Sequence, residues 1–171
     1  MTENDFKIKV LSLAKNVYPL ARRMLGSDEL AHDAVQQSMM KLWESRKQLD
    51  RCTNLKAFVF RVVRNVCLDE LKKKKPFFVE EPGLLSSQTS RIDISHEEQE
   101  MVAIVQQIIN SLVENQREVI QLRDIDGLEF EEIAEITTMD IAYIRVLLSR
   151  ARKTVKENLE RIYAYEAIRK E

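Results

Sequence analysis

Residues 130–155 read FEEIAEITTMDIAYIRVLLSRARKTV, and this stretch decides the fold of the C-terminal half of the chain. It contains two segments with apolar residues at helical spacing, separated by Thr137-Thr138-Met139, which is the form of a helix-turn-helix. Ala134 is small where two helices cross closely, and Asp140 can cap the second helix by accepting backbone N–H bonds. The stretch therefore predicts a DNA-binding motif whose second helix enters a major groove.

The second helix of this motif has a predicted buried stripe and an outward face. Ile144, Leu148, Ala151 and Val155 recur at three- and four-residue steps and form the stripe. On the outward face, an arginine can reach the paired acceptors of a guanine edge while flanking cations hold phosphates. The candidate DNA-contacting residues on and beside that face are Arg145, Val146, Ser149, Arg150, Arg152 and Lys153. The plainer alternative is the solvated face of a helical hairpin.

The whole sequence predicts an all-α fold of two small helical domains joined by a flexible linker. A length of 171 residues allows two domains of roughly 75 residues each. Three glycines and three prolines are too few for many strands and tight turns. Helical spacing is present over residues 5–25, 28–47, 54–75, 96–112, 115–126, 129–136 and 140–169. We expect domains at 1–76 and 96–171, with an acidic and polar linker at 77–95.

The net charge of −1 conceals a strong segregation of charge along the chain. Residues 41–75 carry eleven basic and four acidic side chains, whereas residues 76–135 carry three basic and fourteen acidic ones. Residues 136–171 are basic again, with eight basic and five acidic side chains. Two basic blocks separated by an acidic block suggest two polyanion-binding surfaces on separate modules, although a charge run on a helix is more commonly a solvated face.

The first basic block includes a cationic ridge between the apolar stripes of the helix predicted at 54–75. The ridge residues are Arg61, Arg64, Asn65, Lys72 and Lys73, and two further lysines follow them. A cationic ridge that runs from residue 61 to residue 75 suits a nucleic-acid backbone. The lysines also have a simpler role, because cations at the end of a helix offset the negative end of its dipole.

Several classes of protein are disfavoured by features that the sequence lacks. The longest apolar run, residues 101–105, is far shorter than the roughly 18 residues of a membrane span, and charges interrupt the first thirty positions where a secretory signal has its apolar core. Cys52 and Cys67 form no CxxC pair, and His32 and His96 are isolated. We therefore expect a cytoplasmic protein with reduced cysteines and no catalytic residue, metal site or cofactor.

Three motifs in order along the chain resemble those of the extracytoplasmic-function (ECF) sigma factors of bacterial RNA polymerase. Residues 33–43, DAVQQSMMKLW, resemble part of sigma region 2. Residues 57–65, AFVFRVVRN, followed by DELKK at 69–73, resemble a second signature of that region. Residues 132–136, EIAEI, and 149–153, SRARK, resemble region 4. Three motifs in this order are much more specific than a single helix-turn-helix.

The resemblance implies a protein that binds core polymerase, recognises and melts the minus-ten promoter element with region 2, and reads the minus-thirty-five element with region 4. The residues implied for the polymerase clamp helices are Asp33, Gln36, Gln37, Met40 and Trp43. Those implied for the minus-ten element are Arg51, Cys52, Thr53 and Asn54 in a base pocket, with Arg61, Arg64, Asn65, Lys72 and Lys73 along the DNA. The outward residues of the last helix form the minus-thirty-five set. Further implied partners are the polymerase flap and an anti-sigma factor. We expect no insertion of this chain into a membrane.

The sequence departs from the family pattern at four notable positions. Phe58 stands where the family usually has Trp, and Thr138 where it has Gly. Asp140 stands where it has Ser, and Leu147 where it has a basic residue, which removes one expected cation from the DNA-facing set. Three alternatives remain: a stand-alone helix-turn-helix regulator that does not engage polymerase, a helical adaptor, and, as the least favoured, an enzyme. The motif at 33–43 argues against the first, and the two basic surfaces argue against the second.

Overall fold

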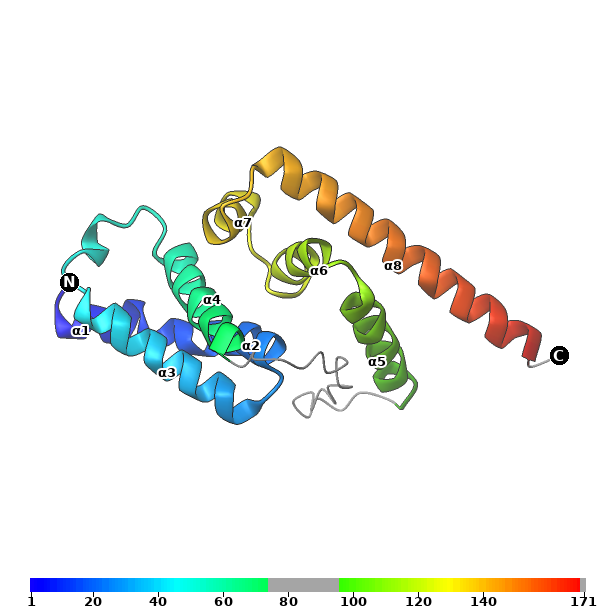
Figure 1. Ribbon diagram of the computed structural model, residues 1–171, viewed down its shortest axis with the longest axis horizontal. Coiled ribbons are helices and arrows are strands. Elements are labelled where there is room, and N and C mark those ends of the chain that lie inside the picture. Colours follow the sequence, from blue (N-terminus) through cyan, green and yellow to red (C-terminus); the bar gives the residue numbers. More distant parts are fainter. Residues whose placement is uncertain (74–95, 170–171) are drawn as a thin grey trace. The chain divides into compact units, whose positions relative to one another are not determined.

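The computed structural model describes residues 1–73 and 96–169, and the regular structure in those ranges is helical (Figure 1). The helices are α1 (Glu3–Lys9), α2 (Ala14–Leu25), α3 (Asp28–Glu44), α4 (Leu55–Lys73), α5 (His96–Ser111), α6 (Glu114–Ile120), α7 (Phe130–Thr137) and α8 (Ile141–Arg169). The all-α prediction is confirmed, and no strand occurs in the described ranges. The linker predicted at 77–95 lies outside them. None of the described helices is long and apolar enough to span a bilayer.

Contacts divide the chain into two compact units. The first unit contains α1 to α4 together with residues Glu131–Thr138, and the second contains α5, α6 and α8. In the first unit, α2, α3 and α4 pack against one another. Their buried side chains include Val17, Leu20, Ala31, Leu42, Val59, Phe60 and Val63. Because apolar residues recur at helical steps, one side of α4 is buried and the other side is left for solvent or a ligand.

The helix predicted over residues 5–25 is divided into α1, a 3-10 turn at Leu11–Leu13, and α2. A capping box that helical periodicity does not reveal starts α1. The Oγ1 of Thr2 accepts from the N–H of Asp5 at 3.2 Å, and the Asp5 carboxylate accepts from the N–H of Thr2 at 3.3 Å. Gly26, directly after the predicted range 5–25, ends α2 with a φ of 71°.

Ser27 caps α3, and Ser45 ends it before the predicted end at residue 47. The Oγ of Ser45 donates to the carbonyl oxygens of Lys41 at 2.9 Å and Leu42 at 3.3 Å. A serine side chain that satisfies carbonyl groups in this way competes with continuation of the helix. The later end predicted from spacing is therefore wrong for a local reason.

In the second unit, α5, α6 and α8 pack against one another. Their core contains Ile108, Ile109, Leu112, Val119, Leu122, Leu128, Ile144, Leu147, Leu148 and Ala151. The helix predicted over residues 115–126 is α6 followed by a π-helical segment at Gln121–Ile125. Gly127 follows this segment with a φ of 66°, a conformation that glycine adopts without strain.

The turn and α8 follow α7 in the order predicted for a helix-turn-helix. Asp140 caps α8, because its Oδ1 accepts from the N–H of Ala142 at 2.8 Å and its carbonyl oxygen accepts from the N–H of Ile144 at 2.9 Å. The predicted capping role of Asp140 is confirmed. Thr138, in the turn, has a φ of 62°.

Candidate nucleic-acid interface

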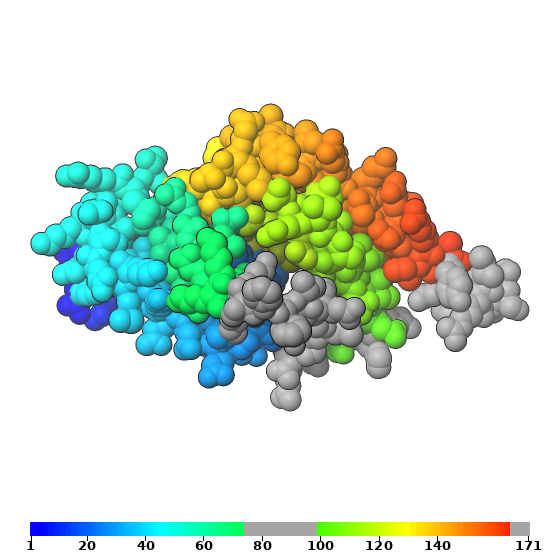
Figure 2. All heavy atoms as spheres, viewed as in Figure 1, coloured from blue at the N-terminus to red at the C-terminus, as the bar shows by residue number. Residues whose placement is uncertain are grey.

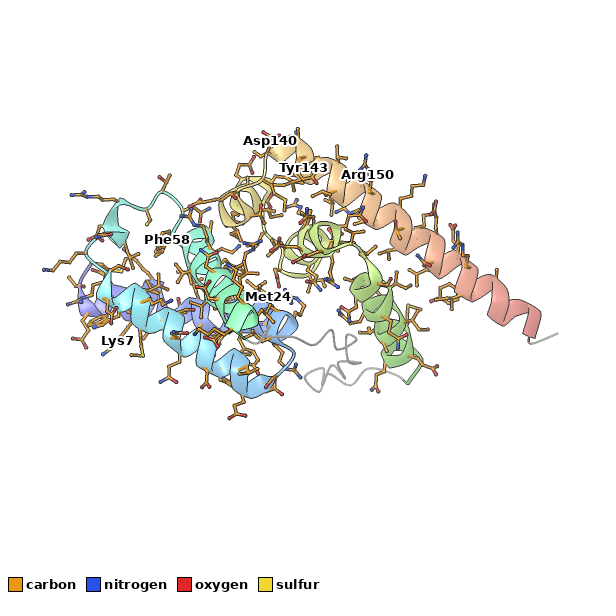
Figure 3. All side chains as sticks on the ribbon, in the orientation of Figure 1. Lys7, Met24, Phe58, Asp140, Tyr143 and Arg150 are labelled. Carbon is orange, nitrogen blue, oxygen red and sulfur yellow. The ribbon has the colours of Figure 1, made fainter. Side chains whose placement is uncertain are left out.

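The N-terminal half of α8 presents a polar and cationic outer face. The six residues predicted to contact DNA are all exposed: Arg145, Val146, Ser149, Arg150, Arg152 and Lys153. Three residues of the predicted buried stripe, Ile144, Leu148 and Ala151, are at most 3% exposed. Figure 2 shows this part of α8, in orange, at the molecular surface, and Figure 3 places Tyr143 and Arg150 along it. The structure brings the predicted residues together on one accessible surface.

Leu147 does not belong to that outer face. Only 4% of its surface is exposed, and it lies in the core of the second unit. The interpretation that Leu147 removes a cation from the DNA-facing set therefore needs correction. A side chain at this position of α8 packs inward, so leucine leaves the outer face unchanged.

Phe130, at the start of α7, lies next to two arginines. The Cζ of Arg145 is 5.2 Å from the ring centroid, and the Cζ of Arg123 is 4.9 Å from it. Arg123 also donates to the carbonyl oxygen of Leu128 at 2.7 Å and to the carboxylate of Glu129 at 2.8 Å. Because a guanidinium is attracted to the face of an aromatic ring, Phe130 helps to position Arg145. An aromatic residue at a helix start was the only sequence signal for this role.

Arg152 is engaged by a carboxylate from another part of the second unit. Its Nε lies 3.0 Å from Oδ2 of Asp124, and its Nη2 lies 2.6 Å from Oδ1. This is a bidentate pair, the strongest common geometry for arginine and a carboxylate. The hydrogen bonds to Asp124 raise the pKa of the Arg152 guanidinium above its usual range. Asp124 lies in the π-helical segment, and no spacing rule connects it with Arg152.

The residues of the cationic ridge predicted on α4 do not all lie on the same side of the helix. Its residues are Arg61, Arg64, Asn65, Lys72 and Lys73. Arg61, Asn65 and Lys72 lie on one side of α4, opposite its buried residues, whereas Arg64 is one turn after fully buried Phe60 and borders the buried side. Asn65 and Lys72 are exposed, whereas the two arginines are half-buried. Lys73 lies beside this row, and its Nζ is 2.6 Å from Oε1 of Glu70, which raises the pKa of Lys73.

The loop before α4 holds the four residues predicted for a base pocket. Arg51 and Thr53 are exposed, and Cys52 and Asn54 are half-buried. Asn54 also caps α4, because its Oδ1 accepts from the N–H of Ala57 at 3.0 Å. Because Oδ1 is used in this cap, the side-chain NH2 group of Asn54 is the part that can bind a base. Phe58, labelled in Figure 3, follows in the first turn of α4.

A groove of about 380 Å³ lies between the N-terminal segment and α3. It is lined by Glu3, Phe6, Lys7, Leu11, Gln36, Met39, Met40, Trp43 and Glu44. Three of the five residues predicted to bind polymerase, Gln36, Met40 and Trp43, therefore share one groove. Asp33 and Gln37 are exposed on α3 but do not line it. The contribution of α1 to this groove was not predicted.

Trp43 anchors one end of this groove. Its ring meets the ring of Phe6 edge to face, with centroids 5.0 Å apart and an interplanar angle of 78°. The Cζ of Arg46 lies 4.1 Å from the Trp43 ring centroid. These contacts fix the Trp43 ring in place and leave it, half-buried, able to contribute to the groove wall.

The cysteines and His32 lie apart from any candidate catalytic arrangement. Cys67 is fully buried in α4, and burial raises the pKa of its thiol to about 11. His32 is exposed, with its ring centroid 4.5 Å from that of Tyr18. Within the described ranges, no three His, Cys, Asp or Glu side chains are grouped so that they could hold a metal ion.

Comparisons with known proteins identify both parts of the chain. The family model of sigma-70 region 2 matches residues 10–77, and that of sigma-70 region 4 matches residues 103–155. The ECF RNA polymerase sigma factor SigW of Bacillus subtilis is 26% identical over 154 residues, which cover 84% of this chain and 82% of that protein. The ECF RNA polymerase sigma-E factor of Haemophilus influenzae is 24% identical over 166 residues, which cover 91% and 87%.

Two solved structures of other proteins are also similar to this chain. The sigma factor RpoE from Bartonella quintana, crystallised with the anti-sigma factor NepR, matches with a TM-score of 0.70 and 26% identity over 91% of this chain and 97% of that one. CnrH, solved with the cytosolic domain of CnrY, has the same fold at 19% identity, with a TM-score of 0.68 over 93% and 90% of the two chains. Sigma factors are transcription regulators rather than enzymes. With both region models matched in the predicted order, the chain belongs to the ECF family of sigma factors of bacterial RNA polymerase.

Proposed function

We propose that this ECF sigma factor, whose family membership implies core polymerase binding and promoter-specific initiation, reads the minus-thirty-five element with the outer face of α8. The observation that carries the proposal is the set of six exposed residues above a buried stripe on one helix. An α-helix fits the major groove, where arginine pairs with the two acceptors of guanine. Region 4 in this proposal is residues 96–171.

The residues of this face have different roles in the proposal. Arg145 and Arg150 reach base edges with their guanidinium groups, and Ser149 adds a hydrogen-bonding hydroxyl. Val146, which is 43% exposed, offers an apolar contact for a thymine methyl group. Lys153 and Arg152 bind phosphates, which fixes the position of the helix on the duplex.

The first unit, assigned to region 2 over residues 1–76, captures the melted minus-ten element. A displaced base enters the loop of Arg51, Cys52, Thr53 and Asn54, where stacking and polar contacts hold it. The row of Arg61, Arg64, Asn65 and Lys72 on α4, with Lys73 beside it, follows the phosphates of the strand and the adjoining duplex. Binding of the unpaired base stabilises the open promoter without a chemical step.

Core polymerase binds the groove between the N-terminal segment and α3, with Asp33 and Gln37 at its edge. Met40 is 58% exposed on the groove wall, and an exposed apolar side chain beside a half-buried tryptophan fits a protein partner. In the proposal, the clamp helices of the polymerase occupy this groove, and the polymerase flap contacts region 4. Both structural neighbours were solved with a protein partner, RpoE with the anti-sigma factor NepR and CnrH with the cytosolic domain of CnrY. The first complex supports an anti-sigma factor for this chain, acting in the cytoplasm.

Transcription with purified components tests the proposal. The full chain is mixed with core polymerase from the same organism and genomic fragments, and the transcript 5′ ends are sequenced. We expect discrete starts that share an upstream element. Arg64→Ala combined with Asn65→Ala should abolish these starts, because the double variant removes a phosphate contact and a polar contact from the α4 row.

A matched control removes a cation and an adjacent asparagine from a different surface of the same unit. Lys15→Ala with Asn16→Ala changes two exposed residues of α2 and should leave every start in place. If the chain binds specific duplexes but gives no starts with core polymerase, the proposal is overturned in favour of a stand-alone regulator.

A further inference from the structure

We infer that Asp124 competes with DNA phosphates for Arg152 and thereby lowers sequence-independent binding by region 4. The inference rests on the proposed role of α8. Its basis is the bidentate pair in which Nε and Nη2 of Arg152 lie 3.0 and 2.6 Å from the two Asp124 oxygens. A carboxylate presents two oxygens to a guanidinium much as a phosphate does, so Asp124 occupies the position that a phosphate would take.

The backbone around Asp124 holds the carboxylate in place. Asp124 belongs to the π-helical segment Gln121–Ile125, whose end is fixed by a bond of 2.9 Å from the N–H of Asp126 to the carbonyl oxygen of Gln121. A second bond of 3.0 Å joins the N–H of Leu128 to the carbonyl oxygen of Leu122. Leu122 and Leu128 are fully buried, so the segment is anchored in the core on both sides of Asp124. Arg152 therefore faces a fixed acceptor.

The other cations of the outer face are held differently. Arg145 lies over the Phe130 ring, which leaves its N–H groups able to reach a base. Lys153 has a long contact, 3.8 Å from Nζ to Glu157, at an exposed i,i+4 position where ion pairs contribute little. Among the described residues of α8, Arg152 is the cation engaged by two short bonds to a carboxylate.

This arrangement affects the part of the affinity that does not depend on DNA sequence. Phosphate contacts contribute affinity on any duplex, whereas base contacts contribute only on the correct sequence. To bind a phosphate, Arg152 has to leave Asp124, so its contribution to binding of arbitrary DNA is reduced. Base reading by Arg145, Ser149 and Arg150 does not involve Asp124. Asp124 in this sense lowers the part of the affinity that does not depend on DNA sequence.

The test measures binding of the full chain, assembled with core polymerase, to a promoter duplex and to a non-promoter duplex over a series of salt concentrations. Asp124→Asn keeps the size of the side chain and removes its charge. We expect about five- to tenfold tighter binding of the non-promoter duplex at 0.1 M salt, and a slope of log K against log salt that is steeper by about 0.9. The gain on the promoter duplex should be no larger, so the preference for the promoter stays the same or falls.

Two further variants separate release of Arg152 from a general charge effect. In an Arg152→Gln background, Asp124→Asn should change affinity by less than about twofold, since no arginine remains to be released. Glu114→Gln removes one exposed carboxylate elsewhere in the second unit and should not alter the salt slope. Arg152→Lys keeps the charge but cannot form the bidentate pair, so it should also tighten non-promoter binding and provides the test if Asp124→Asn does not fold.

The possible outcomes distinguish failure of the inference from failure of the proposed function. If Asp124→Asn has no effect, or the same effect with and without Arg152, the inference is overturned while the proposed function stands. If the wild-type complex binds no duplex and starts no transcripts, the proposed function fails and the inference fails with it.

Discussion

The backbone N–H of Thr138 donates to the carbonyl oxygen of Ala134 at 2.8 Å, and Thr138 itself has a φ of 62°. This geometry is a left-handed helix end, which favours glycine because glycine has no Cβ. Thr138 is the one non-glycine residue with a positive φ in the described ranges. Its branched side chain makes that conformation costly. The turn between α7 and α8 is therefore strained.

Replacing Thr138 by glycine should relieve this strain. We expect Thr138→Gly to raise the free energy of unfolding by about 1 kcal/mol, the relief being offset in part by the greater freedom of glycine in the unfolded chain. Urea unfolding followed by circular dichroism measures the change.

The neighbouring threonine provides a matched control. Thr137 is helical and buried, and its Oγ1 donates to the carbonyl oxygen of Ile133 at 2.7 Å. Thr137→Gly should therefore lower stability by about 1 kcal/mol or more. A loss of stability in Thr138→Gly as well would show that the turn is not strained.

A basic residue, which the family usually has at the position of Leu147, should destabilise this protein. Because the side chain is only 4% exposed, Leu147→Lys places an ammonium group in the core of the second unit. We expect a loss of about 3 kcal/mol or more in stability and no gain in duplex affinity. Val146→Lys, at a neighbouring residue that is 43% exposed, should change stability by less than about 0.5 kcal/mol. Equal stability of the two variants would contradict the assignment of Leu147 to the core.

Met40 tests the groove as a polymerase-binding surface. Met40→Glu places a charge on the groove wall, where we expect it to weaken association with core polymerase by at least about tenfold. The unfolding temperature should stay the same, since the side chain is 58% exposed. Ile8→Glu changes a residue of α1 that is 63% exposed and does not line the groove, and its polymerase affinity should match that of the wild type. Binding is measured by titrating labelled chain with core polymerase.

The Cys67 thiol should make stability depend on pH above neutrality. Burial raises its pKa to about 11 from an ordinary value of 9.0. Between these values the unfolded chain has lost the thiol proton while the folded chain retains it, so stability falls as the pH rises from 9 towards 11. The steepest contribution is about 1.4 kcal/mol per pH unit.

The same titration in Cys67→Ala isolates this contribution from lysines and tyrosines. The variant should be less stable at pH 8, because it leaves a small cavity at a buried position, but its stability should fall less steeply than that of the wild type between pH 9 and 11. Parallel curves for the two proteins would show that Cys67 does not carry the effect. Ellman's reagent at pH 8 should modify half-buried Cys52 and reach Cys67 only on unfolding.

The sequence predicts the helices well where periodicity and caps agree. Asp140 caps α8 as predicted, and Gly26 and Asn54 act at the ends of the helical ranges predicted at 5–25 and 54–75. The break at Leu11–Leu13 was missed because a short 3-10 turn keeps apolar residues close to helical spacing. The π-helical segment at Gln121–Ile125 was missed for a similar reason.

The candidate sites were predictable to the extent that they lie on single helices. The outer face of α8 follows from helical geometry alone, and so does the placement of Arg61, Asn65 and Lys72 on one side of α4. Contacts between distant residues do not, and the pairs Asp124 with Arg152 and Phe6 with Trp43 are the clearest cases. Leu147 illustrates a further limit, since a residue next to an exposed position can be fully turned toward the core.

The most direct test of the central claim is selection of active promoters from a library in which both promoter elements are randomised, using Arg145→Gln. We predict relaxed preference at one or two adjacent positions of the upstream element, by about 1–3 kcal/mol, with the minus-ten preference unchanged. Lys156→Gln, which removes an exposed cation farther along α8, should leave all preferences intact. A uniform loss of activity in both variants, or a change confined to the minus-ten element, would contradict reading of the upstream element by α8.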